Sequence, residues 1–585
     1  MVPGSVTRRA MLSGVAGGMV ATSGCLGELQ NLAGRERQQQ VSVSIATLPV
    51  DEDPYAMRIA TLLSENLLAA GVEAQIEPMT SEVLLRNVLI NHDFDLYVAR
   101  YPDLEDPDQL RSLLYSRYAE EAGWQNPFGY GNIRIDELLE KQRRTEGEIR
   151  KETVHDLQME IVKEQPFTVI AFPDHIAAIR SDRFVNWPAG GLREPLSYLG
   201  LVSVASADTL ELLTTDTRIT RNRNPIAAEH RNRGVISGLL YEPLVRGPTN
   251  SIPWLVRDIE WSDGETLSAI VTIRETPWHD GTALTAGDVA FTYRFLADTS
   301  LGAFDTAVPT PRGRGRISLV DSIELLDDRR IRFEFKTRVR EIARRAFSNP
   351  ILPEHIWRDR TERADIAGID VVGGTTEALV WANEEPVGSG PLQFIESTPD
   401  EEVVFERFDD HFLAGGADGI PEAYTDAPTF DRLRFQIVPS HDAAIELLEN
   451  DEADATIGGL KETIVPEIGR KPSIALSIGQ SLSFYHVGYN CRRSPFSDPR
   501  FRRSVARLLD REMIRSEIFT GYAMPSNVPL SESRWRPPGL EWDDEAHLPF
   551  LGENGDLDVE LARETFREAG YTYDDDDQLV SRGGT

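Results

Sequence analysis

Few residues in this chain are candidates for catalysis or metal binding, and their spacing does not match the motifs that such sites need. Trp278-His279-Asp280-Gly281 holds a His-Asp pair that could serve a metal or a catalytic site, but Asp-Gly after a strand is more often a tight turn. Gly388-Ser389-Gly390-Pro391 lacks the spacing and the lysine of a phosphate-binding loop. The ten histidines are scattered, and neither a Gly-x-Ser-x-Gly elbow nor a His-Glu-x-x-His helix occurs. We therefore predict no catalytic residue, no cofactor and no metal, and hence no enzyme.

The first residues of the chain have the layout of an export signal. Arg8-Arg9 is followed by a short apolar run, as in a twin-arginine signal peptide. Thr22-Ser23-Gly24 then precedes Cys25, in the manner of a lipoprotein cleavage site. We expect residues 1–24 to be the signal, Cys25 to carry a lipid, and 25–40 to be a flexible linker. The apolar run is too short to span a membrane, so membrane attachment is expected only through that lipid, on the outer face of the cell membrane.

The net charge of the chain limits the kinds of molecule that it could bind. The chain has 95 acidic and 61 basic residues, a net charge of −34, and the basic residues are nearly all arginine. Such a surface is typical of proteins that work in high salt, where repulsion between carboxylates is screened. An ordinary acidic protein is the alternative. Nucleic acid and anionic membrane surfaces are excluded as partners, since both need clustered positive charge.

The pattern of apolar residues predicts an α/β fold. Residues 41–98 alternate strand, helix, strand, helix and strand, and a parallel sheet with helices on its faces gives that order. Within this segment Pro54 is expected to open a helix and Gly71 to close it. Residues 167–179 are interpreted as a pair of strands that turn at Pro173.

Several longer stretches resemble the family 5 extracellular solute-binding proteins of ABC importers, the dipeptide and oligopeptide group. They are GLLYEPLVR (238–246), WHDGTALTAGDVAFTYRFL (278–296), ILPEHIW (351–357), PVGSGPLQFIE (386–396), ADATIGGL (453–460), YHVGYNCRRSPFSDPRFRRSVARLLDREMI (485–514) and LARETFREAGY (561–571). The resemblance implies a two-lobed periplasmic-binding-protein fold of type II with three subdomains, and a hinge that closes on a ligand.

Residues 41–180 resemble the part that usually comes last in that family, through 94–110, 128–145 and 160–184. The C-terminal helix and acidic loop lead, in the family, into a strand like 41–48, so we expect a circularly permuted chain. A fusion of two half-proteins is the alternative, but each family segment occurs once. The expected parts are lobe 2 (41–165 and 485–585), the lobe 1 core (166–245 and 386–484) and an inserted subdomain of lobe 1 (246–385).

The resemblance also suggests ligand-binding residues. In peptide-binding members an Asp three residues before the Asp-Pro of one loop pairs with the α-amino group of the ligand, and Asp106-Pro107 places that role on Asp103. A solvated acidic loop is the alternative. Tyr101, Tyr485 and Trp278 are expected aromatic residues of the cleft wall, although core packing would explain each equally well. Ser389 lies in a loop that the resemblance places near the lobe junction.

The function implied by the resemblance is capture of a solute outside the cell and its delivery to an ABC permease and its ATPase. A peptide is the expected ligand, while the family also includes binders of sugars, nickel chelates and haem. The alternatives are a secreted hydrolase of peptides or esters, and a surface sensor or chaperone with the same fold. The protein is expected to be a monomer.

Overall fold

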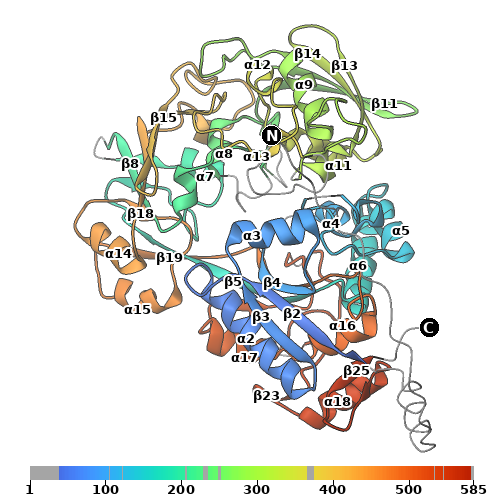
Figure 1. The fold of residues 1–585 in the computed structure, drawn as a ribbon. Helices are drawn as coiled ribbons and strands as arrows, with labels where there is room; N and C mark the ends of the chain where they lie inside the picture. Colours follow the sequence, from blue (N-terminus) through green and yellow to red (C-terminus); the bar gives the residue numbers. More distant parts are fainter. Residues whose placement is uncertain are drawn as a thin grey trace, which may run out of the picture.

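The protein forms two lobes, and both ends of the described chain lie in the same one (Figure 1). The computed structural model describes residues 39–581, apart from gaps at 105, 122, 205–206, 228–234, 248–251, 312, 365–374, 533 and 544–545. We call residues 39–173 and 484–581 the terminal lobe and residues 174–483 the middle lobe. The predicted signal peptide and Cys25 lie outside the described residues.

The terminal lobe is a sheet covered by helices on both faces. Its elements are β1 (Gln39–Gln40), β2 (Ser42–Thr47), α2 (Pro54–Ala69), β3 (Glu73–Pro78), α3 (Ser81–Arg86), β4 (Leu96–Tyr101), α4 (Asp108–Leu114), α5 (Ile133–Gln142), α6 (Gly147–Glu164), the first half of β5 (Phe167–Ile179), β20 (Phe484–Tyr489), α16 (Pro499–Ala506), α17 (Arg511–Met513), β21 (Ala523–Pro525), β22 (Gly552–Glu553), β23 (Asp556–Leu557), α18 (Val559–Glu568), β24 (Thr572–Tyr573) and β25 (Leu579–Ser581). One buried cluster joins the sheet to α2, α16 and α18, and a second joins its other face to α4, α5 and α6. The predicted α/β class is confirmed.

The middle lobe holds the other half of the large sheet and a separate smaller one. Its elements are β6 (Phe184–Val185), α7 (Pro195–Leu199), β7 (Val202–Ser203), β8 (Thr209–Thr214), α8 (Val235–Leu240), β9 (Val245–Arg246), β10 (Ile252–Pro253), β11 (Val256–Asp263), β12 (Leu267–Ile273), α9 (Ala286–Ala297), α10 (Arg314–Ile317), β13 (Val320–Leu325), β14 (Arg330–Phe335), α11 (Arg340–Arg344), α12 (Glu354–Trp357), α13 (Glu377–Val380), β15 (Leu392–Thr398), β16 (Glu402–Arg407), β17 (Arg432–Ile437), α14 (His441–Glu449), β18 (Ala455–Thr456), α15 (Val465–Ile468) and β19 (Ala475–Gln480). The smaller sheet has the order β11-β12-β14-β13.

One mixed sheet runs through both lobes in the order β15-β16-β17-β8-β18-β5-β20-β4-β2-β3, with β19 and β21 also paired to β5. The first half of β5 pairs with β20 and β21, and the second half pairs with β19 and β18. The chain therefore crosses between the lobes within β5 and again between β19 and β20. We call β5, β19 and β20 the hinge strands.

The prediction of a strand pair with a turn at Pro173 is wrong, because β5 is one continuous strand. Proline lacks the N–H that a strand interior normally donates. Pro173 stands opposite Ala523 of β21, and Asp174, the next residue, pairs with Gln480 of β19. The residue without an N–H thus lies at the point where β5 stops pairing with β21 and begins to pair with β19.

Local signals place α2 as expected. The Asp53 carboxylate accepts hydrogen bonds from the backbone N–H groups of Tyr55 and Ala56, and Pro54 occupies the first turn. Gly71 ends the segment with a φ of 87°, which favours glycine.

The two ends of the described chain meet beside α2. Gln39 and Gln40 pair with Ser581 and Val580, and the Val41 N–H donates to the Leu579 carbonyl at 2.8 Å. A circularly permuted chain would bring Val41 beside the C-terminal loop within one lobe, and the described residues have that contact. None of the helices in the described part of the chain is long and apolar enough to cross a membrane.

Candidate ligand cavity between the lobes

A cavity of about 360 Å³ lies between the two lobes. Its walls come from the loop after β4, from Gln109 and Trp124 in the terminal lobe, and from three segments of the middle lobe around 225–246, 296–316 and 348–350. Pockets of this size and position, formed by two lobes around a hinge, are usual ligand sites.

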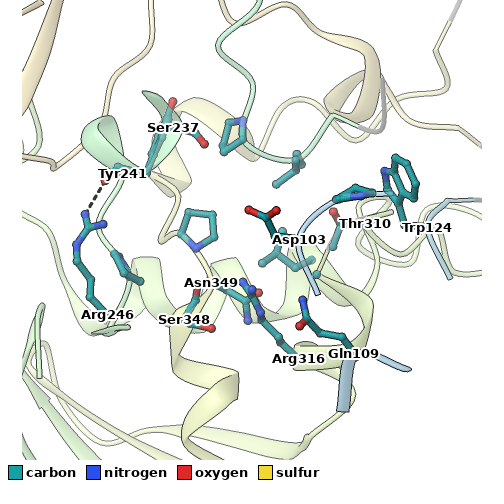
Figure 2. Close-up of a pocket in the computed structure, with 18 of the residues that line it drawn as sticks. Asp103, Gln109, Trp124, Ser237, Tyr241, Arg246, Thr310, Arg316, Ser348 and Asn349 are labelled. Carbon is teal, nitrogen blue, oxygen red and sulfur yellow. Dashed lines mark hydrogen bonds between the residues drawn. The ribbon is translucent and has the colours of Figure 1, made fainter. Parts of the chain in front are cut away.

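The terminal-lobe wall is positioned by aromatic packing at the end of β4. The Tyr101 ring stacks on Phe484 at 5.3 Å between centroids and meets Trp124 edge-on at 5.6 Å. The N–H of Leu104 donates to the Leu482 carbonyl at 3.2 Å, which ties the loop to the segment between β19 and β20. Asp103 is held between these two anchors and lines the cavity (Figure 2).

The middle-lobe wall is built around α8, which supplies Ser237 and Gly238. The Tyr241 hydroxyl accepts a hydrogen bond from the Asn383 amide at 2.8 Å. Arg246 pairs with the fully buried Glu242 and donates to the Gly238 carbonyl at 2.6 Å. This wall is therefore held by contacts within its own lobe.

The two lobes also touch beside the cavity, where α4 packs against α10. Arg143 pairs with Asp108 in the terminal lobe and also donates to the Gly315 carbonyl at 3.0 Å and to the Ser318 hydroxyl at 3.1 Å in the middle lobe. A Cβ on Gly315 would lie 2.1 Å from the Ser112 hydroxyl oxygen, so only glycine allows this approach unchanged. We call this region, Ser112 and Arg143 against Gly315 and Ser318, the closing contact.

Two further ion pairs join the lobes near it. Arg314 pairs with Glu121 at 2.9 Å, and Arg345 pairs with Asp106. Burial acts to raise the pKa of Asp108, but the adjacent Arg143 guanidinium holds that pKa below its ordinary value. The surroundings of Asp108 therefore favour its charged form.

The structure brings together only two of the predicted ligand-binding residues, Asp103 and Tyr101. Trp278 is fully buried in the middle-lobe core, and its backbone N–H donates to the Thr282 carbonyl in a tight turn. Tyr485 is buried in the terminal-lobe core and its hydroxyl donates to Asp53 at 3.0 Å. Neither lines the cavity, and their assignment to a cleft wall stays a prediction.

Ser389 is also fully buried away from the cavity. Its neighbours Gly388 and Gly390 lie so close to α8 that a Cβ on either would meet the Leu240 or Leu239 carbonyl oxygen at 1.9 or 2.0 Å. This loop therefore supports the helix that carries the middle-lobe wall. A ligand contact by Ser389 itself stays a prediction.

The sequence did not indicate Trp124, Thr310, Arg316 or Asn349, which also line the cavity. They stand in loops or at the edges of short helices, where no periodic pattern marks them. Tyr241 lies within 238–246, a stretch that carried the family resemblance, and that was the one available signal. Among the described residues, no three His, Cys, Asp or Glu side chains gather as a metal site would need.

Comparison with known proteins gives a family match and several relatives. The model of the bacterial extracellular solute-binding proteins, family 5, matches residues 250–583, more than half of the chain. The oligopeptide-binding protein AppA of Bacillus subtilis (strain 168) is 24% identical over 307 residues, 52% of this chain and 48% of the relative. Di/tripeptide-binding protein 2 of Pseudomonas aeruginosa (strain UCBPP-PA14) is 22% identical over 294 residues, 49% of this chain and 48% of the relative. The chain thus spans about half the length of these relatives.

Solved structures give partial superpositions. The structure of AppA from Bacillus subtilis in complex with a nonapeptide is 20% identical, with a TM-score of 0.43, over 64% of this chain and 67% of that one. NikZ from Campylobacter jejuni in complex with Ni(L-His) is 18% identical, with a TM-score of 0.42, over 64% of this chain and 66% of that one.

Proposed function

Since the chain belongs to the family 5 bacterial extracellular solute-binding proteins, we propose that it captures a solute outside the cell and delivers it to an ABC import permease and its ATPase. The observation that carries this proposal is the cavity of about 360 Å³ that both lobes line. Because the hinge strands are the connections between the lobes, opening and closing would admit and retain the ligand, with ligand binding favouring the closed form.

A peptide is the ligand class that we favour. The relatives that the chain matches include an oligopeptide-binding, a di/tripeptide-binding and a glutathione-binding protein. Asp103 lines the cavity with a carboxylate oxygen that is buried and has no partner among the described residues. Such an oxygen suits the α-ammonium group of a peptide.

The hydrolase alternative has less support, because the family is one of binding proteins. Burial raises the pKa of Cys491 to about 11, so this thiol is protonated at neutral pH. His279 stands beside Asp280 in sequence, but the carboxylate of Asp280 bonds Thr282 and His355 instead.

The substitution Asp103→Asn tests the peptide proposal, since it keeps the shape and removes the charge. Loss of one partner of a buried ion pair costs about 3–5 kcal/mol, which is a loss of affinity of roughly a hundred- to several-thousand-fold. Mass spectrometry of the protein purified natively in high salt would identify the carried ligand, and calorimetric titration would compare the two forms. A loss below about threefold would mean that the ligand has no amine near Asp103, and a sugar or other neutral solute would become the leading candidate.

Lipid attachment at Cys25 is part of the same proposal, supported by the sequence pattern alone. Cys25→Ser should move the protein from the membrane fraction to the medium, and a paired Arg8→Lys, Arg9→Lys change should retain the precursor in the cell. Because one acyl chain binds a membrane only weakly, two are expected on Cys25. Unchanged membrane association of the Cys25→Ser form would contradict a lipid anchor.

We also propose that the chain is circularly permuted and adapted to high salt. The pairing of β1 with β25 supports the first point, because it joins the two ends of the described chain in one lobe. The net charge of −34 supports the second. A protein in which residue 585 is joined to 41 and the chain is reopened near 204 should fold and bind as the natural order does. Failure of that form to fold, at any salt concentration, would count against the permutation.

A further inference from the structure

Three buried polar atoms without partners line the candidate cavity. They are the Asp103 Oδ1, the Trp124 Nε1 and the Thr310 Oγ1, and none has a hydrogen-bond partner among the described residues. The Thr310 side chain is fully buried. Buried polar atoms in folded proteins are usually paired, and these three line one cavity, so a ligand held there could supply their partners.

The chain brings these three atoms to the same part of the cavity. Trp124 packs against Tyr101, two residues before Asp103, and the backbone N–H of Trp124 donates to the Pro311 carbonyl at 3.2 Å, directly after Thr310. Figure 2 shows the three labelled side chains grouped on the side of the cavity opposite Arg246.

The opposite side of the cavity differs, because its polar groups are paired within the protein. Arg246 is paired with Glu242, and the Tyr241 hydroxyl accepts from the Asn383 amide. A ligand would therefore gain hydrogen bonds on the side of Asp103 and mainly contact area on the other.

The chemistry of the three atoms defines what they can hold. A carboxylate oxygen only accepts, an indole N–H only donates, and a threonine hydroxyl does both. We propose that Trp124 and Thr310 complete, with Asp103, a three-point site for a primary ammonium group that has a carbonyl beside it. The amino terminus and first carbonyl of a short peptide have this arrangement, with the ammonium on Asp103 and the carbonyl on the Trp124 N–H. This inference rests on the proposed binding of peptides.

The three residues also come from different lobes. Asp103 and Trp124 belong to the terminal lobe, whereas Thr310 belongs to the middle lobe just before α10. The site is complete only when the lobes are together, so the Thr310 hydroxyl would recognise the ligand in the closed form alone.

Two conservative substitutions remove the groups with little change of shape. Trp124→Phe removes the indole N–H, and Thr310→Val removes the hydroxyl. Matched controls exist in the same chain, because Trp261 Nε1 and Thr276 Oγ1 are also buried without partners among the described residues but do not line the cavity. Trp261→Phe and Thr276→Val therefore reproduce the chemical change elsewhere.

The probe is a mixture of dialanine, trialanine and tetraalanine, offered with free and with acetylated amino termini to the full chain in molar salt. We expect the wild type to bind the free forms, and each cavity variant to lose about tenfold in affinity, the scale of one hydrogen bond to a charged or buried group. The two controls should remain within about twofold, and all four variants should unfold at the wild-type temperature or above it.

The outcomes separate the two proposals. If the wild type binds no free peptide, peptide capture fails, and the three-point site fails with it. If the wild type binds peptides and both cavity variants bind them equally well, only the three-point site is overturned. Equal binding of acetylated and free peptides would also overturn it, since the ammonium group would then have no role.

Discussion

Gly479 and Gly315 both allow segments that are distant in the chain to touch, but the atoms they touch are of different kinds. A Cβ on Gly479, in β19, would lie 2.8 Å from the Gly190 Cα and 2.9 Å from the Ala189 carbonyl oxygen. A Cβ on Gly315, in α10, would lie 2.1 Å from the Ser112 hydroxyl oxygen of α4. The first neighbour is backbone within one lobe, and the second is a side chain of the opposite lobe.

This difference assigns separate tasks to the two regions. The hinge strands are joined by backbone hydrogen bonds, with β19 paired to β5 from Ala475 opposite Ile179 to Gln480 opposite Asp174. The closing contact is made by side chains such as Arg143, which can separate without unfolding either lobe. Damage to the hinge strands should therefore lower stability, whereas damage to the closing contact should lower ligand affinity.

The largest expected effect is that of Gly479→Ala. Because the added methyl group meets backbone that cannot move independently, we expect a loss of about 3 kcal/mol in the free energy of unfolding, at the upper end for overpacking. Chemical denaturation in molar salt would measure it. Gly469→Ala is the matched control, since a Cβ there would have no neighbour closer than 3.6 Å in the described part of the chain. A Gly479→Ala protein within about 0.5 kcal/mol of wild type would contradict the assignment of stability to the hinge strands.

The sequence predicted those parts of the fold that depend on local signals. Asp53, Pro54 and Gly71 bound α2 because capping and positive φ are properties of neighbouring residues. Pro173 was misjudged because the neighbours of β5 are set by strands some three hundred residues away.

The site was less predictable for a similar reason. Trp278 and Tyr485 are of a type that suits a cleft wall, but burial in a core uses the same aromatic residues, and sequence alone does not separate the two. Trp124 and Thr310 acquire their importance only when the two lobes meet, and neither stands in a periodic segment. Asp103 could be predicted from the sequence because the neighbouring Asp106-Pro107 identifies its loop by resemblance to the family.

Mild acid should distinguish the two regions next. His486, in β20, is buried, and burial lowers its pKa to about 3 from an ordinary 6.5. The folded state keeps the imidazole neutral, so stability is lost as pH falls below 6.5 and continues to fall toward 3. The pKa of the Asp108 carboxyl is lowered in the folded state. Its contribution to the free energy of unfolding therefore persists until the pH falls below the ordinary pKa of 3.8.

Between pH 7 and 5 the hinge strands should therefore weaken, while Asp108, which pairs with Arg143 of the closing contact, stays charged. One pH unit corresponds to 1.36 kcal/mol, so wild type should lose about 2 kcal/mol relative to His486→Gln over the titrating part of this range. Glutamine can still bond the Tyr97 hydroxyl that His486 contacts. Unfolding curves of both proteins at each pH would give the difference. Parallel pH dependences would mean that His486 is charged in the folded state.

The smallest effect, and the most specific, is expected at Gly315. Gly315→Ala should change little, because the Ser112 hydroxyl can rotate away and the Ser112 Cβ lies at 3.4 Å. Gly315→Leu needs more room than one rotation gives, so the lobes must part and a smaller fraction of the protein is closed. Apparent affinity falls in proportion to the closed fraction. We expect about a tenfold loss of affinity for the oligoalanine mixture, or about 1.4 kcal/mol. The free energy of unfolding should be unchanged. Gly131→Leu is the control, since its Cβ has no neighbour closer than 3.6 Å within the terminal lobe. If Gly315→Leu binds like wild type, the bound form does not use the closing contact. If it unfolds like Gly479→Ala instead, both regions serve stability and the contrast between them is lost.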